Sequence, residues 1–253
     1  MANEGLSICE SGWNEEMLKD IHRALMGEMY DWAGEYRTVD VGIAADNVKY
    51  MPPEEVKSKL KETFAFINRN NCFIGMEQGE RIRNLALVFG NLKNAQPFRD
   101  GNTRTAMVFT QLLAGAAGDT VDFNFFAKDV DENGKEGEEL ENFRLAQVAA
   151  RDGNYHYLTL CFSQMVFPVE ERPELAMPRV EIGKQGDLLT TLKKMTGEIP
   201  ALCKPKRIVL EAGEAKSSDS VSDERKEEKR TENSPASMAY SFADIDSGSF
   251  RGR

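Results

Sequence analysis

Nine residues from Gln96 to Arg104 combine the side chains that a phosphate-binding site needs. They read Gln-Pro-Phe-Arg-Asp-Gly-Asn-Thr-Arg and directly precede an apolar stretch with helical spacing. The first backbone N–H groups of a helix have no partner within the helix and can hold phosphate oxygens. Gly101 lets a ligand approach these donors, and Arg104 supplies a planar cation suited to bidentate phosphate contact. Asp100 is a hard oxygen ligand, so the run predicts a site for Mg²⁺ and phosphates.

A simpler interpretation of the same run is a helix preceded by an acidic residue and stabilised by an arginine ion pair. Three features favour the phosphate site instead: the length of the pattern, its position between two apolar helical stretches, and the sequence upstream of it. Phe98 is then expected to be the buried anchor that fixes the loop.

Helices dominate the elements that must position this loop. The spacing of apolar residues predicts one helix from Asn14 to about Tyr30, with Asn14 as its cap. Pro53 favours the start of a second helix, because proline suits the first helical turn. Further helices are expected at about 79–91, 102–114, 138–150 and 154–166. Alternation at 38–43 and 48–51, around a turn at 46–47, predicts one β-hairpin.

Composition changes along the chain and predicts three regions. Residues 14–167 are expected to form one mainly α domain with that single hairpin. An acidic, glycine-containing run at 129–137 is expected to be a surface loop within it. Residues 168–212 look like a linker with a short helix at 188–195, and the serine- and charge-rich residues 213–253 are predicted to be a disordered tail.

The bulk properties exclude several classes of protein. A net charge of −10 and a pI near 5.0 argue against general nucleic-acid binding, which needs a basic face. The four cysteines have no CxxC pair and are expected to be thiols in a reducing compartment. Only two histidines are present, which disfavours a histidine-based zinc site. Since no apolar run approaches membrane-spanning length, we expect a cytoplasmic protein that does not act on membranes.

The nine-residue run resembles the signature of Fic-domain proteins, His-Pro-Phe-x-Asp/Glu-Gly-Asn-Gly/x-Arg. Residues 21–25, Ile-His-Arg-Ala-Leu, and 30–39, Tyr-Asp-Trp-Ala-Gly-Glu-Tyr-Arg-Thr-Val, resemble the front of the same domains. The resemblance covers roughly residues 14–165. It implies a compact helical Fic-like domain with one β-hairpin, the flap, over the active site. It also implies transfer of AMP from ATP to a Tyr, Thr or Ser hydroxyl of a target protein, although some members transfer other phosphate-containing groups.

The resemblance also implies roles for individual residues. Asp100 would bind Mg²⁺, and Arg104 would contact a phosphate of ATP. The anion hole would be formed by Gly101, Asn102 and Thr103. The target protein would add a strand along the flap at about 38–51, over Val39, Val41, Ile43, Val48 and Tyr50.

Three positions depart from the family pattern. Gln96 stands where the family has its catalytic histidine, and glutamine cannot act as a general base near pH 7. Met107 stands where many members have a second arginine, whereas Thr103 in place of glycine keeps its backbone donor. Three hypotheses follow: an impaired adenylyltransferase, a Fic module that binds nucleotide or target without catalysis, or a transferase that uses another phosphate-containing donor.

Other segments bear on regulation and catalysis. His22 and His156 are both expected to be structural rather than substitute bases. Many Fic proteins carry an inhibitory helix with Ser/Thr-x-x-x-Glu-Gly/Asn, and the chain has no clean copy, since Ser220 and Glu224 are followed by Arg225. A separate antitoxin-like inhibitor protein therefore stays open. The polar tail that ends in Arg253 suits either a translocated bacterial effector or a plain disordered terminus.

Overall fold

A computed structural model describes residues 13–43, 48–126 and 137–176, which are mainly helical, as the sequence predicted. In chain order its elements are α2 (Glu15–Met26), β1 (Gly42–Ile43), β2 (Val48–Lys49), α3 (Pro53–Arg69), η2 (Asn71–Phe73), α4 (Gln78–Ala95), α5 (Asn102–Ala116), β3 (Asp119–Val121), α6 (Glu138–Arg151), α7 (His156–Met165), β4 (Val166–Pro168) and η4 (Pro173–Leu175).

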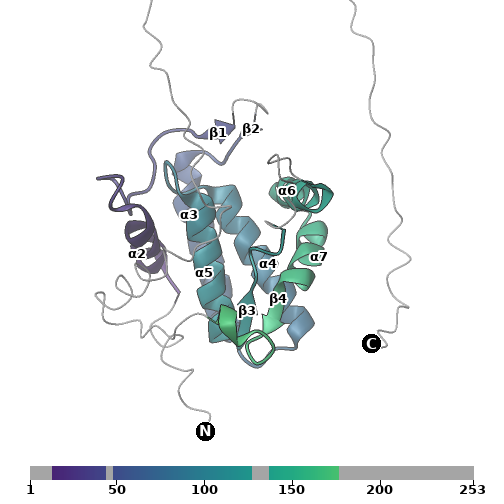
Figure 1. The fold of residues 1–253 in the computed structure, drawn as a ribbon. Coiled ribbons are helices and arrows are strands. Elements are labelled where there is room, and N and C mark those ends of the chain that lie inside the picture. The colour runs from purple at the N-terminus through teal and green to yellow at the C-terminus, as the bar shows by residue number, and fades with distance from the viewer. Residues whose placement is uncertain (1–12, 44–47, 127–136, 177–253) are drawn as a thin grey trace, which may run out of the picture. The chain divides into compact units, whose positions relative to one another are not determined.

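Helices α4 and α5 form the centre of the described part of the chain. Helix α2 lies on one side of them, and α6 and α7 lie together on the other (Figure 1). Phe89 of α4 is fully buried, and its ring packs against those of Phe123, Phe143 and Phe162. This aromatic cluster joins α4 to α6 and α7, so the end of α4 is held by the core.

The helix ends follow local chemistry. The Asn14 side chain accepts a hydrogen bond from the backbone N–H of Met17, which confirms it as the cap of α2. Helix α2 ends at Met26, earlier than expected, because the chain turns at Gly27 and the N–H of Tyr30 returns to the Met26 carbonyl. Pro53 is the first residue of α3, as predicted.

The predicted hairpin is present. Strands β1 and β2 are antiparallel, with Gly42 opposite Lys49 and Ile43 opposite Val48. The Tyr50 N–H also donates to the Val41 carbonyl, at 3.2 Å. A second antiparallel pair, β3 with β4, was not anticipated, because β4 follows α7 without any turn residue that would signal a new element.

Several predicted segments lie in parts of the chain that the structure does not describe. The turn at 46–47, nearly all of the loop at 129–137, the short helix at 188–195 and the tail at 213–253 lie outside the described residues. The domain boundaries at 167 and 212 stay predictions. Within the described ranges, no helix combines the length and apolar character needed to cross a membrane.

The cysteines only partly match the expectation of free thiols. Cys161 is a free thiol, and burial raises its pKa. Cys72 is disulfide-bonded, so the expectation is wrong for this residue. Sequence spacing could not show this, because a disulfide depends on which cysteines the fold brings together.

We expect Arg81→Met to destabilise the fold by about 3 kcal/mol, since it leaves a buried carboxylate unpaired. Arg81 of α4 forms a bidentate ion pair with Asp119 of β3, with N···O distances of 2.5 and 2.7 Å, and the Asp119 side chain is fully buried. Arg83→Met, at an exposed position of the same helix, is the control. Urea unfolding of both variants checks this, and equal midpoints would contradict it.

Candidate functional site

Gln96 terminates α4 and turns its side chain back onto that helix. Its backbone is left-handed, with φ of 41° and ψ of 61°, and its N–H donates to the Leu92 carbonyl at 3.2 Å. The side-chain Nε2 donates to the Lys93 carbonyl at 2.8 Å, and the residue is only 9% exposed. The position predicted to hold the family's base therefore carries an amide that helps to cap α4.

Arg37 ties the base of the hairpin to the end of α4. Its buried guanidinium donates to the carbonyls of Gln96 at 2.6 Å and Ala95 at 3.3 Å. It also donates to the carbonyls of Val39 and Met51, which flank the hairpin. A cation is favourable at the carbonyl end of a helix. Sequence reasoning gave Arg37 no role, because nothing in the local pattern indicates which carbonyls a buried arginine will reach.

Asn102 closes the loop upon itself. Its Oδ1 accepts from the Phe98 N–H and its Nδ2 donates to the Phe98 carbonyl, both at 2.8 Å. Phe98 is fully buried, as expected, and its ring stacks on that of His22 with centroids 3.7 Å apart. Both polar atoms of the Asn102 side chain are therefore used within the loop. Only the backbone N–H of Asn102 is left for the expected anion hole.

His22 is a neutral structural residue, as expected. Its Nδ1 accepts the Gly34 N–H at 2.8 Å, so the proton must sit on Nε2, which donates to the Asp100 carbonyl at 3.0 Å. Burial lowers the pKa of His22 to about 4. With both ring nitrogens occupied, His22 cannot replace the missing base. His156 begins α7 and is exposed, with its ring against Tyr157.

Asp100 is exposed, yet both of its carboxylate oxygens are hydrogen-bonded. Oδ1 accepts the Gly101 N–H at 2.6 Å, and Oδ2 accepts the Tyr30 hydroxyl at 3.0 Å. The Gly101 N–H, expected in the anion hole, is thus donated to the neighbouring carboxylate. This local bond is favoured because the two groups lie in adjacent residues.

The N-terminus of α5 has no side-chain cap. Gly101 takes the N-cap position with φ of 74°, and a Cβ there would lie 2.8 Å from the Met26 sulfur. Among the described residues, no side chain caps the first-turn N–H groups of Asn102, Thr103 and Arg104, so they can donate to a ligand.

Two cations lie beside these donors. Arg104 is partly exposed and forms no hydrogen bond or ion pair with the residues that the structure describes. The Lys93 ammonium donates to the Thr103 hydroxyl at 2.6 Å, which brings a second cation to the same helix turn. The arrangement attracts an anion, since the positive helix end and two basic side chains act together.

Asp100 fits a magnesium–nucleotide better than a metal held by protein alone. No group of three histidine, cysteine or acidic side chains gathers anywhere in the described ranges. Magnesium is commonly held by one or two carboxylates together with substrate phosphates and water. The hydrogen-bonded Asp100 carboxylate, beside N–H groups that can bind phosphate, fits this mode of magnesium binding.

The hairpin residues and Met107 differ in their exposure to solvent. Val39 is 53% exposed, whereas Val41 and Tyr50 are half-buried; Ile43 and Val48 are paired across the hairpin. Met107 is buried in the hydrophobic core, so an apolar side chain occupies the position where the resemblance led us to expect a second arginine.

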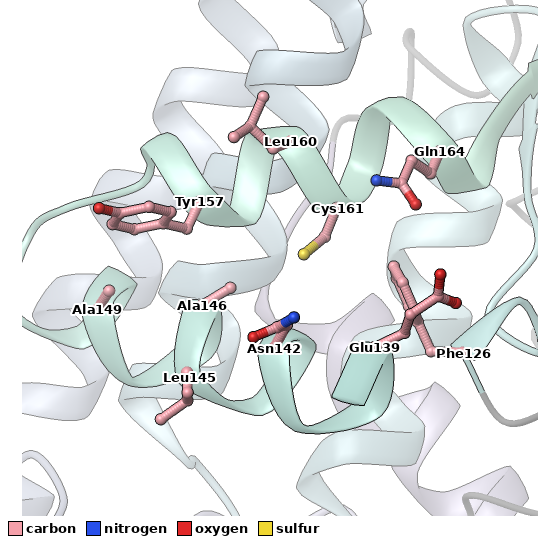
Figure 2. A pocket seen from close by; sticks show the side chains of 10 residues that line it. All are labelled: Phe126, Glu139, Asn142, Leu145, Ala146, Ala149, Tyr157, Leu160, Cys161 and Gln164. Atoms are coloured by element: carbon pink, nitrogen blue, oxygen red, sulfur yellow. The ribbon is translucent and has the colours of Figure 1, made fainter. Parts of the chain in front are cut away.

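A cavity of about 590 Å³ lies between α6 and α7, away from these residues (Figure 2). Its lining is largely apolar and includes Phe126, Leu145, Tyr157, Leu160 and Cys161. None of the predicted site residues lines it, so it is a separate feature of the domain.

Comparison with known proteins finds similarity to one family over part of the chain. The model of the Fic/DOC family matches residues 12–114. The protein adenylyltransferase VbhT of Bartonella schoenbuchensis is 33% identical over 107 residues, which is 42% of this chain and 22% of that protein. The probable protein adenylyltransferase Fic of Escherichia coli is 24% identical over 149 residues, 59% of this chain and 68% of that protein. The chain thus spans only about a fifth of the length of VbhT.

Solved structures share the fold. BepC of Bartonella tribocorum, a VirB-translocated effector with bound AMPPNP, has a TM-score of 0.51 at 24% identity, over 65% of this chain and 81% of that one. The N-terminal Fic domain of an effector from Bartonella sp. AR 15-3 has a TM-score of 0.53 at 20% identity, over 66% and 80%. The helical domain therefore has the fold of these Fic-domain structures.

We expect the folded protein to keep the His22 imidazole neutral down to about pH 4. Because the unfolded chain protonates this histidine near pH 6.5, stability should fall as the pH drops below 6.5 and level off below about 4. The loss is about 3 kcal/mol.

NMR titration of the two imidazoles checks this directly, since the chain has only two histidines and His156→Ala assigns the signals. A His22 signal that titrates near pH 6.5 would contradict the expectation. His22→Asn should flatten the pH dependence of unfolding.

Proposed function

We propose, since residues 12–114 match the Fic/DOC family model, that the chain binds a magnesium–nucleotide at the N-terminus of α5 and transfers AMP from ATP to a hydroxyl of a target protein, with release of pyrophosphate. One observation carries the proposal: the first turn of α5 has no side-chain cap and lies beside the hydrogen-bonded Asp100 carboxylate and the partly exposed Arg104. Relatives named protein adenylyltransferases support the reaction class.

Backbone groups and two basic side chains would bind the phosphates. The N–H groups of Asn102, Thr103 and Arg104 supply fixed donors, which need no reorganisation when charge develops. The Arg104 guanidinium would make bidentate contact with phosphate oxygens, and Lys93 adds charge at close range.

Asp100 would hold Mg²⁺ against these phosphates. The ion would neutralise phosphate charge and polarise the phosphorus centre under attack. The hydrogen bonds from Gly101 and Tyr30 keep the carboxylate oriented for this role.

The target protein would bind along the β1–β2 hairpin. The hairpin described here has only two paired residues in each strand, and it can accept an extended segment by β-strand addition. Arg37 fixes the base of the hairpin to the end of α4, so a bound segment would be held at a set distance from the nucleotide.

Proton removal is the weak step of the proposed reaction. The Gln96 amide cannot take a proton from the target hydroxyl, and its Nε2 already donates to the Lys93 carbonyl. General base catalysis commonly contributes about 10²–10⁴-fold, so we propose that this chain transfers AMP slowly.

A second candidate is a Fic module that binds nucleotide or target without catalysis. The engagement of Gln96 with its own helix favours it, as does the burial of Met107 where many members have an arginine for the triphosphate. A transferase with another phosphate-containing donor and a base supplied by the substrate is consistent with the same phosphate donors.

The binding half of the proposal predicts that ATP or ADP binds in the presence of Mg²⁺ and that Arg104→Ala weakens binding about tenfold or more, through loss of a charge-assisted contact. Calorimetry measures this. Arg83→Ala, an exposed arginine on α4, should bind like the wild type. No binding by the wild type at millimolar nucleotide would show that the proposal is wrong.

The catalytic half predicts that Gln96→His raises AMP transfer by about 10²-fold or more. Histidine tolerates the left-handed backbone of this position better than most residues, so the loop should keep its shape. The assay uses labelled ATP, Mg²⁺ and a lysate, with Gln96→Asn as the control that should stay slow. If Gln96→His binds nucleotide and transfers no label, the non-catalytic module is the better description.

A further inference from the structure

Asp100 is held by donors from three separate places in the chain. His22 of α2 donates to its backbone carbonyl, the Gly101 N–H donates to Oδ1, and the Tyr30 hydroxyl donates to Oδ2. We propose that Tyr30 is a positioning residue that orients the Asp100 carboxylate toward the Mg²⁺ of the bound nucleotide. This inference rests on the proposed function and adds a residue that the signature does not contain.

A stack of rings fixes the place of the Tyr30 hydroxyl. The Tyr30 ring lies 4.3 Å from that of Trp32 at an interplanar angle of 16°. Trp32 stacks in turn on His22 at 5.9 Å, and His22 stacks on the fully buried Phe98 at 3.7 Å. The stack runs from the core to the surface, so the hydroxyl is positioned by the same side chains that anchor the loop.

The exposed flank of the stack is covered by a cation. The Arg99 guanidinium lies 5.6 Å from the centre of the Trp32 ring, within the range of a cation–π contact. Arg99 directly precedes Asp100 in the chain. A side chain of the loop therefore contacts the Trp32 ring on which Tyr30 stacks. The stack and the loop therefore hold each other in place.

The hydrogen bond from Tyr30 restrains rotation of the Asp100 carboxylate. The Gly101 N–H fixes Oδ1, and the Tyr30 hydroxyl at 3.0 Å fixes Oδ2, which together set the rotation of the carboxylate plane. Each oxygen keeps a second lone pair for a metal. Bonds of this kind to a metal-binding carboxylate typically change metal affinity by 10–100-fold when removed.

The closing experiment measures ADP affinity by calorimetry on the full chain, in excess Mg²⁺ and in EDTA. Tyr30→Phe keeps the ring stack and removes only the hydroxyl. We expect the gain in affinity that Mg²⁺ provides to be about tenfold smaller in this variant, with affinity in EDTA unchanged. Tyr157→Phe, at an exposed position of α7, is the matched control and should behave like the wild type.

A double-mutant cycle separates positioning from general structure. In an Asp100→Asn background, Tyr30→Phe should have no further effect on the Mg²⁺-dependent gain, because it acts only through the carboxylate. A structural role would instead lower affinity in EDTA, reduce the urea midpoint and persist in the Asp100→Asn background. Any of these three results would overturn the inference.

The outcomes also separate this inference from the proposed function. Wild type that binds no nucleotide in either condition refutes the proposed site and the inference together. Wild type that binds equally well in Mg²⁺ and EDTA keeps the nucleotide site and refutes the positioning role. A normal Mg²⁺-dependent gain in Tyr30→Phe refutes the positioning role alone.

Discussion

The buried hydrogen bonds that hold the segment from Gln96 to Asn102 are the constraint on which the site depends. Arg37 secures the end of α4, Asn102 brackets the backbone of Phe98, and His22 holds the Asp100 carbonyl. Polar groups this deep in a protein are costly unless they are paired. The arrangement of the loop pairs all of these groups, and it places the start of α5 beside Asp100.

The same bonds divide the site into a fixed part and a part that is free to bind. Side chains that could compete for the α5 donors are occupied elsewhere: Asn102 with Phe98, and Thr103 with Lys93. Gly101 has no side chain with which to cap the helix. Among the residues that the structure describes, no side chain caps the first turn of α5, and the neighbouring polar groups are paired with one another.

Phosphate binding and proton transfer would use different groups of this loop. The phosphate donors are backbone N–H groups and basic side chains, whereas the position of the base is a single side chain at the end of α4. Gln96 satisfies the helix end through its backbone N–H and its amide, and neither bond involves the start of α5. A substitution at this position can therefore alter the chemistry and leave the anion site in place.

Local properties were determined by the sequence alone. Apolar spacing, the Asn14 cap and Pro53 located the helices, and the residue types between Gln96 and Arg104 indicated a phosphate site without a titratable base. These features depend on neighbours within one or two helical turns, which sequence spacing describes well.

Only the tertiary structure decided which distant groups meet. It paired β3 with β4, placed Arg37 on the α4 carbonyls 58 and 59 residues away, and brought Tyr30 to a carboxylate 70 residues away. It also turned the Gly101 N–H and the Asn102 side chain to uses other than the expected anion hole. Such contacts are fixed by packing of the core, and no periodicity in the sequence records them.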